Sequence, residues 1–327
     1  MKTLLSTVTP VYQGENFLIE LVHSLHHLRQ EIENIGFDSA WIYDHLTPLA
    51  GKISNPDLSN RLLEPWTILP SLAAETTNLR LGTIVTSNAY RFPTLLAKIA
   101  SSVDVMSEGR LEFGIGGGWH IEDYTSYGFN FPNAKIRTER LAESIKLIKL
   151  IWERNEVDFE GKYYSFKDMT LYPKPYQKPH PPIWMGGKSK NFLRIVAEHA
   201  DYCNFANPSL EDCTNRLQIL KNHCLNIGRN FDDIGKTWHG DVILVDKESD
   251  LKEEVTRYRE DFINHEIRET TVEDMIHQNI VGTPEQCVEK IQKYSDLGIT
   301  YFIPHFPYKP NLRSHRIFID QVASQFK

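Results

Sequence analysis

The stretch RLGTIVTSNAYRFPTLLAKIASSVDVMSEGRLEFGIGGGWHIEDYTSYGF, residues 80–129, carries the pattern that decides the fold. Two short apolar runs, at 80–86 and 110–115, are bounded by polar residues and read as buried strands. Between them, residues 93–108 place four apolar side chains on one helical face: Leu96, Ile99, Val103 and Met106. The stretch therefore predicts a strand, a helix and a second strand that runs into three consecutive glycines.

The same alternation of strand and helix continues along the chain. Strands are expected at about 3–9, 38–43, 80–86, 110–115, 182–185, 201–205, 236–245 and 300–304, and nearly all are followed by helical patterns. Helical periodicity is clearest at 17–35, 65–75, 93–108, 136–152, 210–227 and 283–298. Eight such units without a linker predict one (β/α)8 TIM barrel over residues 1–327, with a doubly wound open sheet as the competing architecture.

Two long segments interrupt this alternation. Residues 155–181 read as a hairpin followed by a proline-stiffened segment on the rim of the barrel. Residues 46–63 form the second long connection. Long loops at the mouth of a barrel usually shape its substrate pocket, so both segments are expected to contact the substrate.

Composition points to a cytoplasmic protein that acts on small molecules. The chain is 41% hydrophobic, and its net charge of -7 comes from interspersed acids and bases, without the basic run that a nucleic-acid or membrane partner would need. No apolar stretch approaches the length of a membrane helix, and the N-terminus does not read as a signal peptide. The four cysteines show no CxxC spacing, which fits a reducing compartment.

Residues that follow the strands are the candidates for function, because a barrel holds its site at the carboxyl ends of the strands. The candidates are Asp44 and His45; Val85, Thr86, Ser87 and Asn88; Gly116, Gly117, Gly118, Trp119 and His120; and Gly186, Gly187, Lys188 and Ser189. Neither glycine loop is a familiar nucleotide motif. Trp119 stands where GxGxxG needs its third glycine, and no glycine lies five positions before Gly187 to make a P-loop.

Glycines after strands can simply form turns, but two such loops beside a histidine and an asparagine favour a ligand. Bare backbone lets a flat ring or a phosphate approach its N–H groups, and a helix that begins near Ser189 adds its positive end. We therefore expect a cofactor that carries a ring and a phosphate.

Other classes of site have weaker support. His23, His26 and His27 share one helix, but no carboxylate pattern completes a metal site, so no metal is expected. No GxSxG motif occurs and no cysteine lies in a glycine loop, which argues against covalent hydrolysis. Tyr127 is expected to serve packing.

Several segments together resemble the luciferase-like monooxygenase superfamily, especially its branch of coenzyme F420-dependent oxidoreductases. Besides residues 80–129, they are GFDSAWIYDH (36–45), FEGKYYSF (159–166), PKPYQKPHPPIWMGG (173–187) and VGTPEQCVEKIQKYSDLGITYFI (281–303). The resemblance covers residues 36–304. It implies a TIM barrel whose mouth holds a reduced flavin, either F420 or FMN, against a bulged third strand. That bulge often contains a non-proline cis peptide, which would fall among Ile84, Val85, Thr86 and Ser87.

The resemblance also implies roles for single residues. The cofactor phosphate would be bound by Gly186, Gly187 and Ser189, with Lys188 between them, and by a His-x-x-x-Tyr pair matched by His120 and Tyr124. His45 matches the active-site histidine, which can move a proton near neutral pH, and Asp44 could orient it. Some sugar-phosphate dehydrogenases of the family have a tryptophan and a glutamate where this chain has Leu49 and Trp119, which argues against that substrate.

The resulting expectation is a flavin-type oxidoreductase that transfers hydride with F420. The alternatives are an FMNH2-dependent monooxygenase served by a flavin reductase, a non-catalytic flavin-binding protein, and a metal-dependent hydrolase on the same fold. A flavin or F420 reductase is a candidate partner. Because family members are often dimers, a homodimer is a further candidate.

Overall fold

The computed structural model describes residues 2–6, 31–47, 63–262, 271–306 and 312–326, and most of its strands belong to one parallel sheet. The strands of this sheet are β1 (Lys2–Ser6), β2 (Ser39–Ile42), β3 (Arg80–Thr83), β4 (Thr86–Ser87), β5 (Leu111–Gly116), β8 (Ile183–Gly186), β9 (Tyr202–Ala206), β10 (Gly235–Leu244), β11 (Ile280–Gly282) and β12 (Tyr301–His305).

The sheet closes on itself. Its neighbours run in the order β1, β2, β3, β5, β8, β9, β10 and β12, and β12 pairs in turn with β1. Each of these pairings is parallel, which confirms the predicted (β/α)8 barrel and excludes an open sheet. The short strand β11, which the sequence analysis did not anticipate, extends the sheet beside the end of β10.

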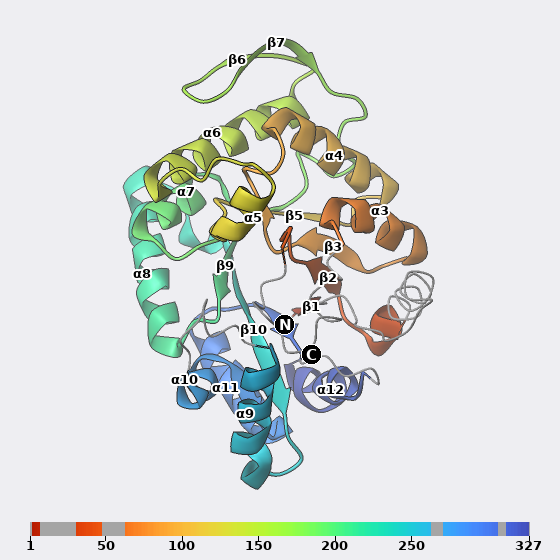
Figure 1. Ribbon diagram of the computed structural model, residues 1–327, viewed down its shortest axis with the longest axis vertical. Helices are drawn as coiled ribbons and strands as arrows, with labels where there is room; N and C mark the ends of the chain where they lie inside the picture. Colours follow the sequence, from red (N-terminus) through yellow and green to blue (C-terminus); the bar gives the residue numbers. More distant parts are fainter. Residues whose placement is uncertain (1, 7–30, 48–62, 263–270, 307–311, 327) are drawn as a thin grey trace.

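Helices cover the outside of the barrel, and Figure 1 shows α3, α4, α6, α7 and α8 as an arc around the strands. The helices are α3 (Pro65–Glu75), α4 (Pro93–Met106), α5 (Ile121–Ser126), α6 (Ala134–Glu153), α7 (Lys190–His199), α8 (Leu210–Ile227), α9 (Leu251–Phe262), α10 (Val272–Gln278), α11 (Pro284–Asp296) and α12 (Arg313–Ile317). Local chemistry explains their starts. Thr283 and Gln286 form the capping box of α11, and Ser189 caps α7 through the Phe192 amide.

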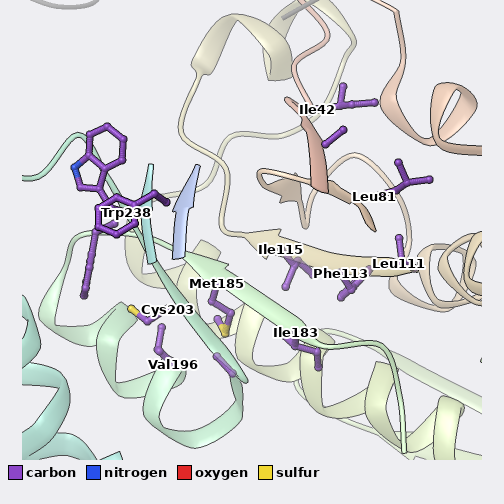
Figure 2. Packing of buried hydrophobic residues seen from close by; sticks show 14 of the residues in the cluster. Ile42, Leu81, Leu111, Phe113, Ile115, Ile183, Met185, Val196, Cys203 and Trp238 are labelled. Carbon is purple, nitrogen blue, oxygen red and sulfur yellow. The ribbon is translucent and has the colours of Figure 1, made fainter. Parts of the chain in front are cut away.

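The core has two layers, one on each face of the sheet. The outer layer packs the strands against the helices, and Figure 2 shows part of it, including Ile42, Leu81, Leu111, Phe113, Ile115, Ile183, Met185, Val196, Cys203 and Trp238. Inside the barrel, Trp184 stacks on Tyr202 with ring centroids 4.0 Å apart and contacts Trp41 edge-on at 4.6 Å. Because this interior is filled by aromatic rings, space for a ligand is expected only at the ends of the strands.

The third barrel strand is interrupted, which the apolar run at 80–86 did not indicate by itself. The strand stops after Thr83 and resumes as β4 at Thr86, and the peptide bond between Ile84 and Val85 is cis. The cis bond implied by the family resemblance is thereby confirmed at its expected place.

The rim segment at 155–181 also has the predicted form. Its first part is an antiparallel hairpin of β6 (Glu156–Glu160) and β7 (Ser165–Thr170), which projects beyond α6 in Figure 1. Its second part contains two cis prolines, Pro173 and Pro179. The predicted helix at 17–35 is described only at its end, where residues 31–35 are helical, and most of the predicted pocket segment at 46–63 lies outside the described residues.

Candidate active site

The predicted site residues lie where β2, β4, β5 and β8 end, at one mouth of the barrel. The ring of His45, after β2, lies 5.6 Å from the ring of His120 and 5.7 Å from that of Trp119, both after β5. Ser87 of β4 pairs with Gly116 of β5, which brings the bulge beside the first glycine loop. The fold therefore gathers these loops, while the role of each residue remains a prediction.

His45 is held by a carboxylate to which the sequence analysis assigned no role. Its Nδ1 lies 2.7 Å from Oδ2 of Asp123, a fully buried side chain in the first turn of α5. A neutral imidazole that is bonded to a carboxylate through Nδ1 carries its proton on that atom. Nε2 is then the ring nitrogen of His45 that can accept a proton.

Asp123 is the anchor of this arrangement. Its Oδ1 accepts hydrogen bonds from the amides of Leu46 (3.0 Å) and Thr47 (2.7 Å) and from the Thr47 hydroxyl (2.6 Å), and Tyr90 donates to Oδ2 at 2.9 Å. Burial alone would raise the pKa of Asp123, but the hydrogen bonds from His45 and Thr47 outweigh it and hold the pKa well below its usual range. Asp123 is therefore an anion that fixes the loop carrying His45.

The expectation that Asp44 orients His45 is wrong. Both oxygens of Asp44 are bound by Arg91, at 2.7 and 3.1 Å, and Oδ2 also accepts the Ser87 amide at 3.2 Å. Arg91 in turn pairs with Glu64. Burial raises the pKa of Asp44, and Arg91 opposes that shift. Because neighbouring side chains leave the backbone in different directions, Asp44 ties β2 to the loop after β4 instead of reaching its neighbour.

The bulged strand uses its polar side chains mostly within the protein. The buried Thr86 hydroxyl donates to Thr83 Oγ1 at 2.9 Å and accepts from Trp66 Nε1 at 2.8 Å. Ser87 Oγ lies 3.3 Å from the Tyr124 hydroxyl. Thr86 is thus engaged in holding the interrupted strand, and its predicted contact with a cofactor would involve its backbone.

Packing explains why two of the three glycines, Gly116 and Gly118, have no side chain, but it does not explain Gly117. A Cβ on Gly116 would lie 2.7 Å from Val85 Cγ2, and a Cβ on Gly118 would lie 1.9 Å from the Tyr124 hydroxyl. Gly118 also has a backbone φ of +70°, which residues with a side chain rarely adopt. A Cβ on Gly117 would approach only Arg137, at 4.0 Å. Packing therefore excludes a side chain at Gly116 and Gly118, whereas a Cβ on Gly117 would make only ordinary contacts; that the three glycines clear room for a cofactor stays a prediction.

The predicted His-x-x-x-Tyr pair divides into two roles. Tyr124 is fully buried, and its hydroxyl donates to the Gly117 carbonyl at 3.2 Å, while burial raises its pKa. This tyrosine holds the glycine loop in place. His120 is also buried, but its Nε2 has no hydrogen-bond partner among the residues that the structure describes, and Glu122 Oε2 is 3.7 Å away. His120 is the member of the pair with unused capacity.

A second buried polar atom at the mouth also lacks a partner. Asn88 donates through Nδ2 to the Tyr164 hydroxyl at 3.3 Å, yet within the described part of the chain its Oδ1 accepts no hydrogen bond. An unpaired buried polar atom costs about 1 to 3 kcal/mol, so such atoms usually mark a partner that binds there. The Asn88 oxygen and the His120 nitrogen therefore fit a polar ligand.

The second glycine loop, after β8, is only partly set by packing. A Cβ on Gly187 would lie 2.6 Å from the Phe192 ring, whereas one on Gly186 would make ordinary contacts. Lys188 and Ser189 are exposed, and Ser189 Oγ accepts the Phe192 amide at 3.2 Å. A capping hydroxyl can still donate its own proton, so the start of α7 retains donors for an anion.

Two aromatic side chains near the mouth are exposed. Trp119 is 55% exposed although its ring borders His45 and His120. Tyr127 is 58% exposed, so the expectation that it serves packing is wrong. Tyr127 follows the last turn of the short helix α5, and its side chain is not part of the hydrophobic core formed by the described residues.

Within the part of the chain that the structure describes, no group of three or more His, Cys, Asp or Glu side chains could hold a metal ion. His23, His26 and His27 lie outside that part. All four cysteines are buried free thiols. None of the described helices is long and apolar enough to cross a membrane.

Comparison with known sequences identifies similar enzymes. The chain is 29% identical over 314 residues to an F420-dependent glucose-6-phosphate dehydrogenase of Microbacterium testaceum, with 90% of each chain covered. It is 26% identical over 272 residues to an FMNH(2)-dependent dimethylsulfone monooxygenase of Pseudomonas putida, covering 74% of this chain and 73% of that one.

Comparison with solved structures supports the fold. An F420-dependent secondary alcohol dehydrogenase, solved with an F420-acetone adduct, matches with a TM-score of 0.83 at 16% identity, covering 99% of this chain and 98% of that one. The F420-dependent tetrahydromethanopterin reductase of Methanopyrus kandleri matches with a TM-score of 0.79 at 19% identity, covering 100% and 99%. The sequence profile described as luciferase-like monooxygenase matches residues 9–301. With nearly its whole length matched by that profile, the chain belongs to the luciferase-like monooxygenase family.

Proposed function

We propose that this protein is an oxidoreductase that transfers a hydride between coenzyme F420 and a small organic substrate. The observation that carries the proposal is the 2.7 Å contact of His45 Nδ1 with Asp123. This contact leaves Nε2 of His45, at the mouth of the barrel, as the ring nitrogen that can accept a proton. F420-dependent enzymes among the relatives, at up to 29% identity over 90% of the chain, support this choice of cofactor.

The residues at the mouth fit such a cofactor. Gly117 leaves room for a ligand at its backbone, since a Cβ there would meet only Arg137 at 4.0 Å, and the buried Asn88 Oδ1 and His120 Nε2 have no hydrogen-bond partner among the described residues. We assign the ring to the bulge at Val85–Asn88 and the loop at 116–118, and the phosphate to His120 and the loop at 186–189. Tyr124 and Asp44 would not touch the cofactor but would hold these loops in position.

When bound, the deazaflavin would supply a hydride donor or acceptor, and the protein would supply orientation and proton management. Asp123 holds His45 in one tautomer, so that Nε2 can accept or return a proton at the site during the reaction. The buried Asp44–Arg91 pair keeps the end of β2 against the loop after β4. The proton acceptor is thereby fixed with respect to both cofactor loops.

Glucose 6-phosphate, the substrate named for several relatives, is not proposed. Trp119 stands where the family resemblance places a glutamate, and Leu49 stands where it places a tryptophan. An exposed indole beside His45 favours a less polar substrate than a sugar phosphate.

Anaerobic turnover tests the proposal. The purified protein is given F420 with a panel of alcohols, or reduced F420 with aldehydes, ketones and imines, and the change in F420 absorbance is followed without O2. Turnover under these conditions supports hydride transfer. Activity that needs reduced FMN and O2 would contradict it.

A second candidate is an FMNH2-dependent monooxygenase, because the dimethylsulfone monooxygenase of Pseudomonas putida is 26% identical over 272 residues. That function would need a separate flavin reductase as a partner. Within either function, a homodimer and a cytoplasmic location are part of the proposal, and sedimentation of the purified protein measures the first of these.

A further inference from the structure

A second aspartate–histidine pair lies at the same mouth as His45. His305 is the last residue of β12, and its Nδ1 lies 2.8 Å from Oδ1 of Asp241 on the neighbouring strand β10. The Tyr258 hydroxyl of α9 donates to the same carboxylate oxygen at 2.9 Å. The pair repeats the geometry of His45 and Asp123, with Nδ1 turned to the carboxylate.

The pleat of the strand places His305 inside the barrel. Side chains two positions apart share a face, and Tyr301 and Ile303 both belong to the aromatic cluster that fills the barrel interior. The ring of Tyr43 confirms this position, because its centroid lies 6.2 Å from that of His305 and 6.3 Å from that of His45. Both histidines therefore border one aromatic side chain at the end of the barrel.

The pair is partly open at the mouth. The His305 side chain is 17% exposed and that of Asp241 is 11% exposed, close to the 13% of His45. Among the described residues, no hydrogen bond reaches Nε2 of His305. The Tyr258 hydroxyl of α9 also lies 3.3 Å from Nδ1 of His305, so the contact with α9 is made through Asp241 and Nδ1 and does not involve Nε2.

We propose that His305, oriented by Asp241, is a second proton-transfer residue of the site, acting on an oxygen of the substrate. The inference rests on the proposed hydride transfer with F420. In alcohol oxidation, the C–H bond breaks and its hydrogen leaves with both electrons as hydride to F420. The O–H bond also breaks, its proton passes to Nε2 of His305, and a carbonyl forms; in carbonyl reduction the same proton returns. Asp241 acts only as a positioning residue.

Two variants and a control test the pair. His305→Ala removes the imidazole, Asp241→Asn removes the charge but keeps the size, and His277→Ala, the control, changes an exposed histidine of α10. F420 affinity is measured by fluorescence, and oxidation is measured with propan-2-ol, cyclohexanol and benzyl alcohol. Added imidazole at constant pH tests chemical rescue, which a merely structural role would not show.

We expect F420 affinity within about threefold of wild type in all three variants. Turnover should fall at least about 100-fold in His305→Ala, the scale of general acid–base catalysis, and recover at least about tenfold with imidazole. Wild-type turnover in His305→Ala, a loss that imidazole does not repair, or no oxidation of any of these alcohols by F420-bound wild type would overturn the proposal.

A measurement without cofactor separates this inference from the proposed function. Nitrogen NMR of histidine-labelled apoprotein, with His305→Ala used to assign the signals, reports which ring nitrogen carries the proton. The inference requires the Nδ1–H tautomer in wild type and its loss in Asp241→Asn. An Nε2–H tautomer in wild type would overturn it even if F420 binds, whereas a failure to bind F420 would refute the proposed function alone.

Discussion

Nδ1 of His45 and Oδ2 of Asp123 lie 2.7 Å apart, although 78 positions separate the two residues in the chain. The contact joins the loop after β2 to the helix that follows the glycine loop of β5. One buried carboxylate thereby links the expected proton carrier to the expected cofactor loop. A substitution of Asp123 should therefore lower turnover more than it lowers F420 affinity.

Asp123→Asn tests this link. The amide keeps the size of the side chain but can donate to Nδ1, which would move the imidazole proton to Nε2 and remove the acceptor. Turnover should fall about 100-fold, with F420 affinity within about threefold of wild type. Glu211→Gln, in the first turn of α8, is the matched control. Equal turnover in the two variants would refute the role of Asp123.

Alanine substitutions at the neighbouring residues Gly116 and Gly117 are expected to affect different properties, stability for the first and F420 affinity for the second. Gly117→Ala adds a methyl group that makes only ordinary contact with Arg137, so the free energy of unfolding should change by less than about 0.5 kcal/mol while F420 affinity falls about tenfold. Gly116→Ala drives a methyl group into Val85 and should cost about 1 to 3 kcal/mol of stability. Chemical denaturation and fluorescence titration measure the two quantities. Similar destabilisation by both substitutions would contradict the assignment of Gly117.

Removal of His120 Nε2, which has no hydrogen-bond partner among the described residues, is expected to affect stability and cofactor binding differently. His120→Leu removes a buried Nε2 without a partner, so the unfolding free energy of the apoprotein should stay equal or rise by about 1 kcal/mol. F420 affinity should fall about tenfold, because the proposed phosphate contact is lost. A less stable variant with unchanged F420 affinity would mean that His120 is a structural residue.

A pH effect on stability is expected at His315, away from the cofactor loops. Its ring lies 4.4 Å from that of Phe306, and its buried Nδ1 makes no hydrogen bond to any of the described residues. Burial, and then the charge of His305, lowers the pKa of His315 from 6.5 to about 4. Between these values the unfolded chain binds more protons than the folded one, so this contribution to stability is lost as pH falls from about 6.5 towards 4.

His315→Leu should therefore flatten the dependence of unfolding free energy on pH in this window, by at most about 3 kcal/mol. Urea denaturation at a series of pH values measures this dependence, with His277→Leu, at an exposed position of α10, as the control. If the two variants show the same pH dependence, His315 is not held neutral by the fold.

Periodicity alone located most of the barrel. Helix α3 occupies residues 65–75 as expected, and the capping box of Thr283 and Gln286 begins α11 where the motif stands. The interruption between Thr83 and Thr86 could not be read from propensity, because Ile84 and Val85 are themselves good strand residues. It was indicated only by resemblance to a family.

The site was found in outline because residues after parallel strands meet at one mouth. The choice of Asp44 over Asp123 failed because pairing between distant loops depends on backbone directions that spacing does not encode. The same rule applied to the predicted strand at 300–304 would have brought out His305, whereas Asp241 lies within β10 and would not have been found by it. The sequence of three glycines also cannot show which of them packs against Val85 or Tyr124 and which could accommodate a side chain.

Binding of the cofactor is the most direct test of the account. Purified apoprotein would be titrated in parallel with F420 and FMN, each oxidised and reduced, while fluorescence and thermal stability are followed. A ligand that binds only the folded state must raise the melting temperature. The account predicts saturable F420 binding with a stabilisation that FMN does not match. Selective binding of FMN, or no binding of either cofactor, would contradict it.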